Sequence, residues 1–86
     1  MRIAFDEVAW EDYEFWQATD RKQLKRINRL LDDICRDPES SDGIGKPERL
    51  KHALAGARSR RIDSEHRVVY LVEGDLGIVL SLRYHY

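Results

Sequence analysis

The sequence predicts an α+β domain, in which a helical hairpin packs on a mostly antiparallel sheet in the order β-α-α-β-β-β. Residues 20–36 place apolar side chains at the spacing of an amphipathic helix. Residues 57–86 instead hold short apolar runs that are separated by turn residues, as in antiparallel strands. A chain of 86 residues has room for one hydrophobic core, so we expect a single domain over residues 1–86.

The first expected elements are a short strand at residues 2–6 and a helix at residues 8–19. Apolar and polar side chains alternate loosely in the strand. Asp6 stands where a helix N-cap is needed, and Glu7 follows in the first turn, where an acidic side chain is favourable. One stripe of this helix combines Ala9, Tyr13 and Trp16.

A second helix is expected after the break at Thr19 and Asp20. Asp20 and Gln23 have the spacing of a capping box. The apolar stripe of this helix consists of Leu24, Ile27, Leu31 and Ile34. Asp37-Pro38 ends the helix, and residues 37–47 form a loop rich in serine, glycine and proline.

Three strands are expected in the remainder, at residues 57–62, 66–73 and 76–84. Alternation in the last strand predicts that one face carries Ile78, Leu80, Leu82 and Tyr84. Arg83 and His85 are then expected on the other face.

Composition excludes several classes of protein. The longest apolar run, residues 68–72, is far too short to span a membrane, and the acidic first twenty residues do not resemble a signal or transit peptide. The single cysteine, Cys35, allows neither an internal disulfide nor a zinc site built on cysteine pairs. Cys35 follows the apolar stripe and is expected to be structural, in a protein of the reducing cytoplasm.

A net charge of −1 conceals a strong segregation of charge. Residues 1–20 contain six acids and one base, whereas residues 21–36 contain six bases and two acids. Residues 46–67 add seven bases and three acids. The chain could therefore present a basic face to a polyanion, although solvated faces with mixed ion pairs would have the same composition.

The sequence contains no glycine-rich phosphate loop, no nucleophile elbow and no histidine pair spaced for a metal. What remains is a carboxylate, a histidine and several guanidiniums, a set that suits phosphoryl transfer within RNA. There the 2′-hydroxyl is the nucleophile, and the protein supplies a base, an acid and cations. Two plain alternatives stay open: Glu48 as a surface acid beside Lys51, and Arg67 paired with Glu65 or Glu73.

The whole chain closely resembles the YoeB branch of the RelE-like bacterial toxins. The resemblance rests on the motifs Trp10-Glu11-Asp12-Tyr13, Gly45-Lys46-Pro47-Glu48, Leu50-Lys51-His52, Ser59-Arg60-Arg61-Ile62, Glu65-His66-Arg67 and Arg83-Tyr84-His85-Tyr86. It implies the RelE-like microbial RNase fold. The family often has aromatic residues where Ala57 and Arg58 stand, so Arg58 is expected to add a cation near the site.

The resemblance also implies an activity, that of a ribosome-dependent endoribonuclease that cuts messenger RNA in the A site without a cofactor or metal. By carry-over, Glu48 would be the general base and His85 the general acid. Arg67 would stabilise the transition-state phosphate, and Tyr86 would stack on the substrate nucleotide. Lys51 and Arg61 would bind substrate, with His52 in a supporting role.

The partners that the resemblance implies are the ribosome, messenger RNA and a YefM-like antitoxin. Operator DNA would be contacted only through the antitoxin, with the toxin as co-repressor, and members of the branch can form homodimers. The alternative functions are a ribosome- or RNA-binding inhibitor that cuts nothing, and a degenerate toxin kept as an antitoxin-bound co-repressor.

Overall fold

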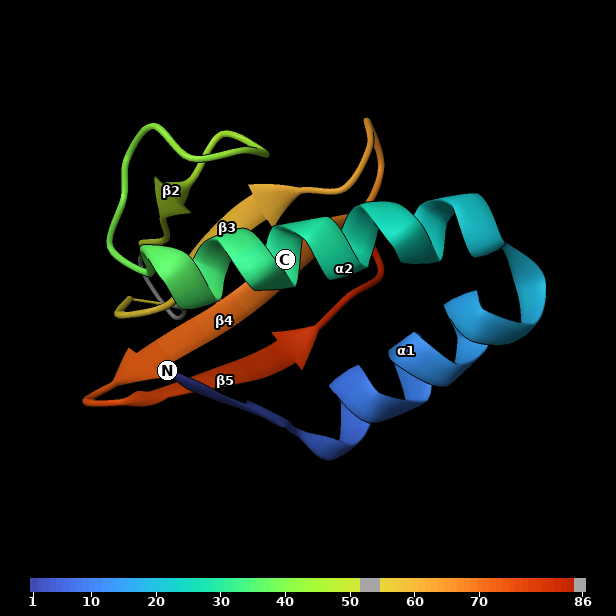
Figure 1. The fold of residues 1–86 in the computed structure, drawn as a ribbon, viewed down its shortest axis with the longest axis horizontal. Helices are drawn as coiled ribbons and strands as arrows, with labels where there is room; N and C mark the ends of the chain where they lie inside the picture. The colour runs from blue at the N-terminus through green and yellow to red at the C-terminus, as the bar shows by residue number, and fades with distance from the viewer. Residues whose placement is uncertain (52–54, 85–86) are drawn as a thin grey trace.

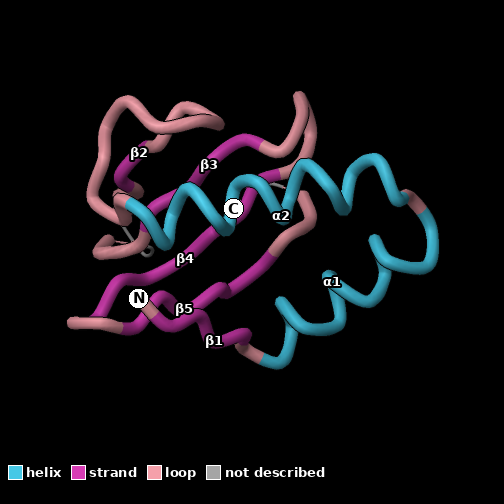
Figure 2. The backbone as a smooth tube through the Cα atoms, viewed as in Figure 1, coloured by secondary structure: helices cyan, strands magenta, loops and turns pink. Residues whose placement is uncertain are grey.

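The computed structural model describes residues 1–51 and 55–84 and confirms the α+β class, with two helices on one face of a five-stranded sheet (Figure 1). The elements are β1 (Arg2–Phe5), α1 (Glu7–Thr19), α2 (Arg21–Arg36), β2 (Glu48–Arg49), β3 (Arg58–Arg61), β4 (Arg67–Glu73) and β5 (Leu76–Ser81). The strand order is β1-β5-β4-β3-β2. Only β1 runs parallel to its neighbour, β5, so the described sheet is mostly antiparallel as expected (Figure 2).

The helix boundaries follow the sequence signals closely. Asp6 occupies the N-cap of α1 in extended conformation, although its side chain makes no capping hydrogen bond. Asp20 does cap α2, because its carboxylate accepts the backbone N–H of Gln23 at 3.0 Å. The helix ends at Arg36, directly before Asp37-Pro38, as predicted. No helix in the described ranges is long and apolar enough to cross a membrane.

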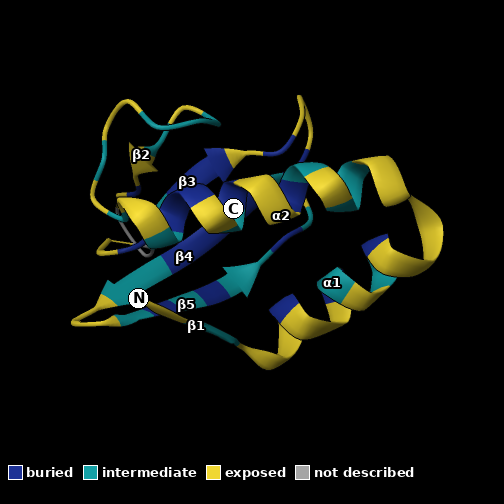
Figure 3. Cartoon of the chain, viewed as in Figure 1, coloured by how far each residue is buried: buried dark blue, intermediate teal, exposed yellow. Residues whose placement is uncertain are grey.

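The main core lies between the helices and the sheet. It is formed by Ala9, Trp16, Ile27, Leu30, Ile34, Ile62, Val68, Tyr70, Val79 and Leu82. Figure 3 shows buried segments on both helices and along β3, β4 and β5. The predicted stripe of α2 is confirmed, but Leu30 and the acid Asp33 are also buried on it.

Within residues 1–51 and 55–84, both helices lie on one face of the sheet, and none covers the opposite face. A second, smaller cluster lies there, made of Leu50, Ala57 and Val69 with Leu71 and Leu80 packed against it. Val68 and Tyr70 alternate with Val69 and Leu71 along β4, so the two clusters lie on opposite faces. We call the second surface the helix-free face.

The predicted face of the last strand is wrong. The pairing of β4 with β5 shifts between Val69 and Tyr70, which face Ser81 and Val79, so Leu80 bulges out of register. A bulge reverses the alternation beyond it. Leu80 therefore packs on the helix-free face, whereas Leu82 enters the main core on the other side.

The last strand also ends earlier than predicted, at Ser81 rather than Tyr84. Side chains of α1 take over the hydrogen bonds of the next residue. The Asp12 carboxylate accepts the Leu82 N–H at 2.9 Å, and the Trp16 indole donates to the Leu82 carbonyl at 3.0 Å. These bonds replace a strand partner at Leu82, and Tyr84 lies beyond the end of β5.

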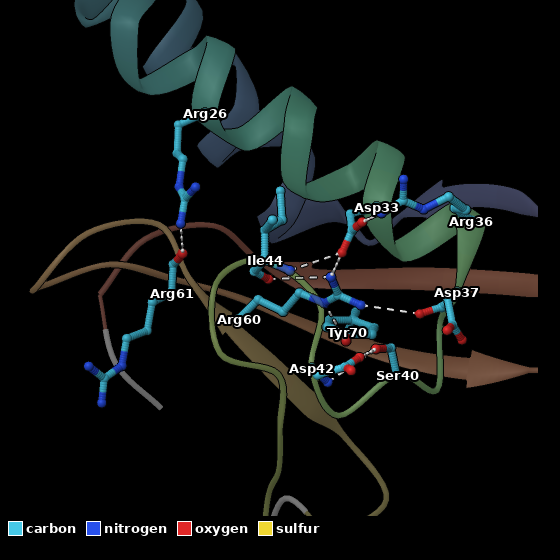
Figure 4. A network of polar contacts seen from close by, with 10 residues as sticks. All are labelled: Arg26, Asp33, Arg36, Asp37, Ser40, Asp42, Ile44, Arg60, Arg61 and Tyr70. Atoms are coloured by element: carbon cyan, nitrogen blue, oxygen red, sulfur yellow. Dashed lines mark hydrogen bonds and ion pairs between the residues drawn. The ribbon is translucent and has the colours of Figure 1, made fainter.

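A buried ion pair fastens the loop after α2. Arg60 of β3 is fully buried, and its guanidinium pairs with Asp33 of α2. It also donates to the Tyr70 hydroxyl at 3.1 Å and to the carbonyls of Ile44 and Asp37, each at 3.3 Å (Figure 4). Arg60 is therefore a structural residue of its motif, because each nitrogen of its guanidinium has a partner within the fold.

The Asp33 carboxylate stays ionised in this setting. Burial alone would raise the pKa of Asp33, but hydrogen bonds from Arg60 and the Ile44 N–H, with the charges of Arg36 and Arg60, lower it below its usual value. Both members of this ion pair therefore hold the loop between α2 and β2: Asp33 accepts the Ile44 N–H, and Arg60 donates to the carbonyls of Asp37 and Ile44.

Candidate active site

Glu48 and Arg67 meet on the helix-free face, near one end of the sheet. Glu48 lies on β2 opposite Ser59, and Arg67 starts β4 opposite Arg61. An Arg67 Nη1 atom lies 3.2 Å from Glu48 Oε1. Glu48 directly follows the predicted loop and lies on the two-residue strand β2. The contact also corrects the plain alternative for Arg67: among the described residues, its ion pair is with Glu48 and not with Glu65 or Glu73.

Ser59 orients the guanidinium of Arg67. Its side chain is fully buried on β3, and its hydroxyl accepts a hydrogen bond from Arg67 Nη1 at 3.1 Å. Sequence reasoning gave Ser59 no role. Its position in the motif could have indicated this role, because side chains alternate along β3 and Ser59 therefore lies on the face opposite the buried Arg60.

The two partners differ in exposure. The Glu48 side chain is 51% exposed, whereas that of Arg67 is 15% exposed. A carboxylate that is open to solvent can accept a proton from a docked substrate, and a fixed guanidinium beside it can stabilise negative charge on a phosphate. The pair thus combines two of the chemical groups that RNA cleavage needs.

Arg61 is exposed at the edge of this area and points away from the buried Arg60 network (Figure 4). It lines an open pocket of about 300 Å³ together with Arg26, Gly45, Lys46, Ile62, Asp63 and Ser64. The backbone carbonyl of Arg61 accepts a hydrogen bond from Arg26 at 3.3 Å. Three cationic side chains around one pocket suit a phosphate group.

Of the remaining predicted site residues, the structure describes only Lys51. Lys51 is exposed two residues beyond β2, and within the described chain it has no hydrogen bond or ion pair to the Glu48–Arg67 pair. His52, His85 and Tyr86 lie outside the described residues, so their roles stay predictions.

Arg58 does not join the site. Its guanidinium pairs with Glu39 of the preceding loop at 2.8 Å. Arg58 alternates with Ser59 and shares the face of Arg60, so the expected extra cation near the site is directed to the other side of the sheet. The acid-rich loop supplies its partner.

The turn before Arg67 is held by Asp63. Burial opposes ionisation of this carboxyl, but hydrogen bonds from the His66 and Glu65 N–H groups and from Gln23 lower the pKa of Asp63 below its usual value. The turn therefore places His66 and Arg67 firmly at the start of β4. Residues 1–51 and 55–84 contain no group of three histidine, cysteine or acidic side chains that could hold a metal ion.

Comparison with known proteins gives consistent matches. The family model of a YoeB-like toxin of bacterial type II toxin–antitoxin systems matches residues 5–86. Toxin YoeB of Streptomyces coelicolor is 54% identical over 86 residues, which cover 100% of both chains. The solved YoeB/ParE toxin from Agrobacterium tumefaciens is 44% identical, covers 100% of both chains and has a TM-score of 0.94.

A third relative comes from Staphylococcus aureus. Its YoeB, solved in a heterotetrameric complex with YefM, is 46% identical with a TM-score of 0.90 and covers 100% of this chain and 98% of that one. A YoeB dimer from S. aureus has also been solved. The chain shares its two helices over a mixed sheet with these proteins, which places it in the fold class of small bacterial toxins. Within that class, this chain belongs to the YoeB-like toxin family.

Proposed function

We propose that this toxin is a ribosome-dependent endoribonuclease that cuts messenger RNA in the A site and so inhibits translation. The observation that carries the proposal is the contact of Glu48 with Arg67 on the open, helix-free face. A carboxylate base and a fixed guanidinium at that contact fit attack by an RNA 2′-hydroxyl on its own 3′-phosphate.

In the proposed reaction, Glu48 accepts the proton of the 2′-hydroxyl as its oxygen attacks phosphorus. Arg67 stabilises the negative charge of the five-coordinate phosphate. The bond from phosphorus to the 5′-oxygen breaks, and His85 donates a proton to that leaving oxygen. The products are a 2′,3′-cyclic phosphate, which can open to a 3′-phosphate, and a 5′-hydroxyl.

The other site residues bind the substrate in this proposal. Tyr86 stacks on the nucleotide, a contact worth about 1–3 kcal/mol per base. Arg61 and Lys51 contact phosphates, and His52 supports them. The pocket that Arg61 shares with Lys46 and Arg26 supports this part, because it gathers three cationic residues that can bind phosphate.

A matched pair of variants tests the nuclease proposal by primer extension on a defined message in a purified translation system. Glu48→Gln removes the base, and Glu73→Gln changes an exposed carboxylate on the same sheet, at the far end of β4. Wild type and Glu73→Gln should produce new ends only when ribosomes are present, and Glu48→Gln should not. Stalled translation without new ends in all three would favour the alternative, inhibition by occupancy alone.

The proposed protein partner is a YefM-like antitoxin, supported by the YefM complex of the S. aureus relative. It would silence the toxin in the cytoplasm, and the complex would repress its operon through DNA contacts of the antitoxin. A homodimer is proposed from the S. aureus YoeB dimer. Co-expression with a YefM-like protein followed by size-exclusion chromatography with light scattering tests both assemblies.

A further inference from the structure

The segment after β5 is held tightly although it has left the sheet. Leu82 is anchored to α1 through Asp12 and Trp16, as described above. Arg83 follows with its guanidinium 3.7 Å from the centre of the Phe15 ring, and it donates to the Tyr84 hydroxyl at 3.0 Å. These contacts bring the chain back to the start of β4.

Two neighbouring residues at the start of β4, His66 and Arg67, bind the backbone of Tyr84. The Tyr84 N–H donates to His66 Nδ1 at 2.8 Å, and the Arg67 N–H donates to the Tyr84 carbonyl at 3.3 Å. Tyr84 has a φ of 61°, a left-handed conformation that is unfavourable for a residue with a bulky side chain. The His66 contact is therefore placed where the backbone needs an external restraint.

The His66 ring is itself fixed. Its centre lies 4.9 Å from that of Trp16 in an edge-to-face arrangement, and its Nε2 lies 3.3 Å from Glu65 Oε1. Its backbone N–H donates to Asp63 Oδ1 at 2.6 Å. Because Nδ1 accepts the Tyr84 N–H, the ring carries its proton on Nε2, the atom that faces Glu65.

We propose that His66 is a positioning residue, whose Nδ1 fixes the backbone of Tyr84 and so sets the direction in which the chain leaves Tyr84 toward His85 and Tyr86. The inference rests on the proposed nuclease function, in which those two terminal residues act. One dipeptide, His66-Arg67, then serves both halves of the site: Arg67 contacts Glu48, and His66 holds the approach to the general acid.

Two substitutions separate the acceptor from the ring. His66→Phe keeps an aromatic ring against Trp16 but has no acceptor for the Tyr84 N–H. His66→Asn loses the ring but offers a carbonyl oxygen close to the position of Nδ1. If His66→Phe does not give a wild-type circular dichroism spectrum, His66→Leu takes its place as the variant without an acceptor.

The readouts are hydrogen exchange of the Tyr84 amide by NMR, single-turnover cleavage on ribosomes, and ribosome affinity. His66→Phe should speed the amide exchange at least about tenfold and slow cleavage by about 10- to 100-fold, because small misplacements of reacting groups are costly. The ribosome affinity of His66→Phe should stay within about twofold of wild type. His66→Asn should restore most of the cleavage rate and most of the protection of the Tyr84 amide from exchange.

Cleavage at the wild-type rate by His66→Phe, with fast Tyr84 exchange, would overturn the positioning role. Slow exchange in that variant would also overturn it, by showing that the Tyr84 amide does not depend on His66. A wild-type protein that cuts nothing would instead overturn the proposed nuclease function, while the exchange data would still decide whether His66 holds Tyr84.

Discussion

Glu48 and Arg67 come from strands that are not neighbours, and they meet across β3, whose Ser59 lies between them and accepts a hydrogen bond from Arg67. The sheet order β4-β3-β2 creates this meeting. A single short strand, β2, thus decides whether the candidate base reaches the guanidinium.

Arg67→Gln should lower the rate of ribosome-bound message cleavage by about 10²- to 10³-fold, because one fixed donor to the developing charge is lost. Arg67→Lys should recover only part of the rate, since an ammonium cannot reproduce the guanidinium contacts with Glu48 and Ser59. Single-turnover kinetics measures both. Arg2→Gln, an exposed arginine paired with Asp75, is the control and should cut like wild type.

Ser59→Ala should slow cleavage less than Arg67→Gln does, because the guanidinium stays but loses one orienting acceptor. A lost hydrogen bond of this kind changes the free energy of unfolding by about 0.5–1.5 kcal/mol. Urea unfolding and single-turnover kinetics on the same samples separate the two effects. Unchanged cleavage would show that the hydroxyl does not orient Arg67 for the reaction.

Asp33→Asn should destabilise the fold by about 3–5 kcal/mol, because it leaves Arg60 buried without its charged partner. The neighbouring Asp32→Asn is a matched control on the exposed side of α2 and should stay within about 0.5 kcal/mol of wild type. Thermal or urea unfolding measures both. Equal stability of the two variants would contradict a structural role for the Arg60–Asp33 pair.

The same pair predicts an acid dependence. The folded state lowers the pKa of Asp33, so its contribution to stability is full above the unfolded pKa of about 3.9 and is lost as the pH falls through the lower folded value. The unfolding free energy of wild type should therefore drop below about pH 4. Asp33→Asn should show a shallower drop over the same range, and an equally steep one would contradict the assignment.

Arg58→Gln should leave cleavage within about twofold of wild type, because the Arg58 guanidinium pairs with Glu39 on the other side of the sheet from the Glu48–Arg67 pair. The measurement is again single-turnover cleavage. A loss as large as that of Arg67→Gln would show that the cation does reach the substrate.

Local signals in the sequence were enough for most of the fold. The stripe of α2 and the capping by Asp20 were readable because helical periodicity and caps involve near neighbours. Which side chains of the last strand face the core could not be predicted, because the bulge at Leu80 depends on how β4 pairs with β5.

The sequence was enough to predict which residues form the site, but not how these residues contact one another. The motifs pointed to Glu48 and Arg67, yet their contact depends on the pairing of β2, a strand too short to give a pattern of its own. Arg60 could not be told from Arg61 by composition, because burial of an arginine requires a partner such as Asp33 that lies 27 positions away. His66 likewise acquires its role only from the return of the chain to Tyr84.

The most direct test of the account replaces the 2′-hydroxyl of the substrate. Once primer extension has located the cut, the message is remade with a single 2′-deoxy nucleotide on the 5′ side of the cut bond and offered to the toxin on ribosomes. The account predicts that cleavage at that bond is abolished, whereas the unmodified message yields a downstream fragment with a 5′-hydroxyl. Continued cutting of the deoxy message at the same bond would contradict attack by the 2′-hydroxyl, and with it the role given to Glu48.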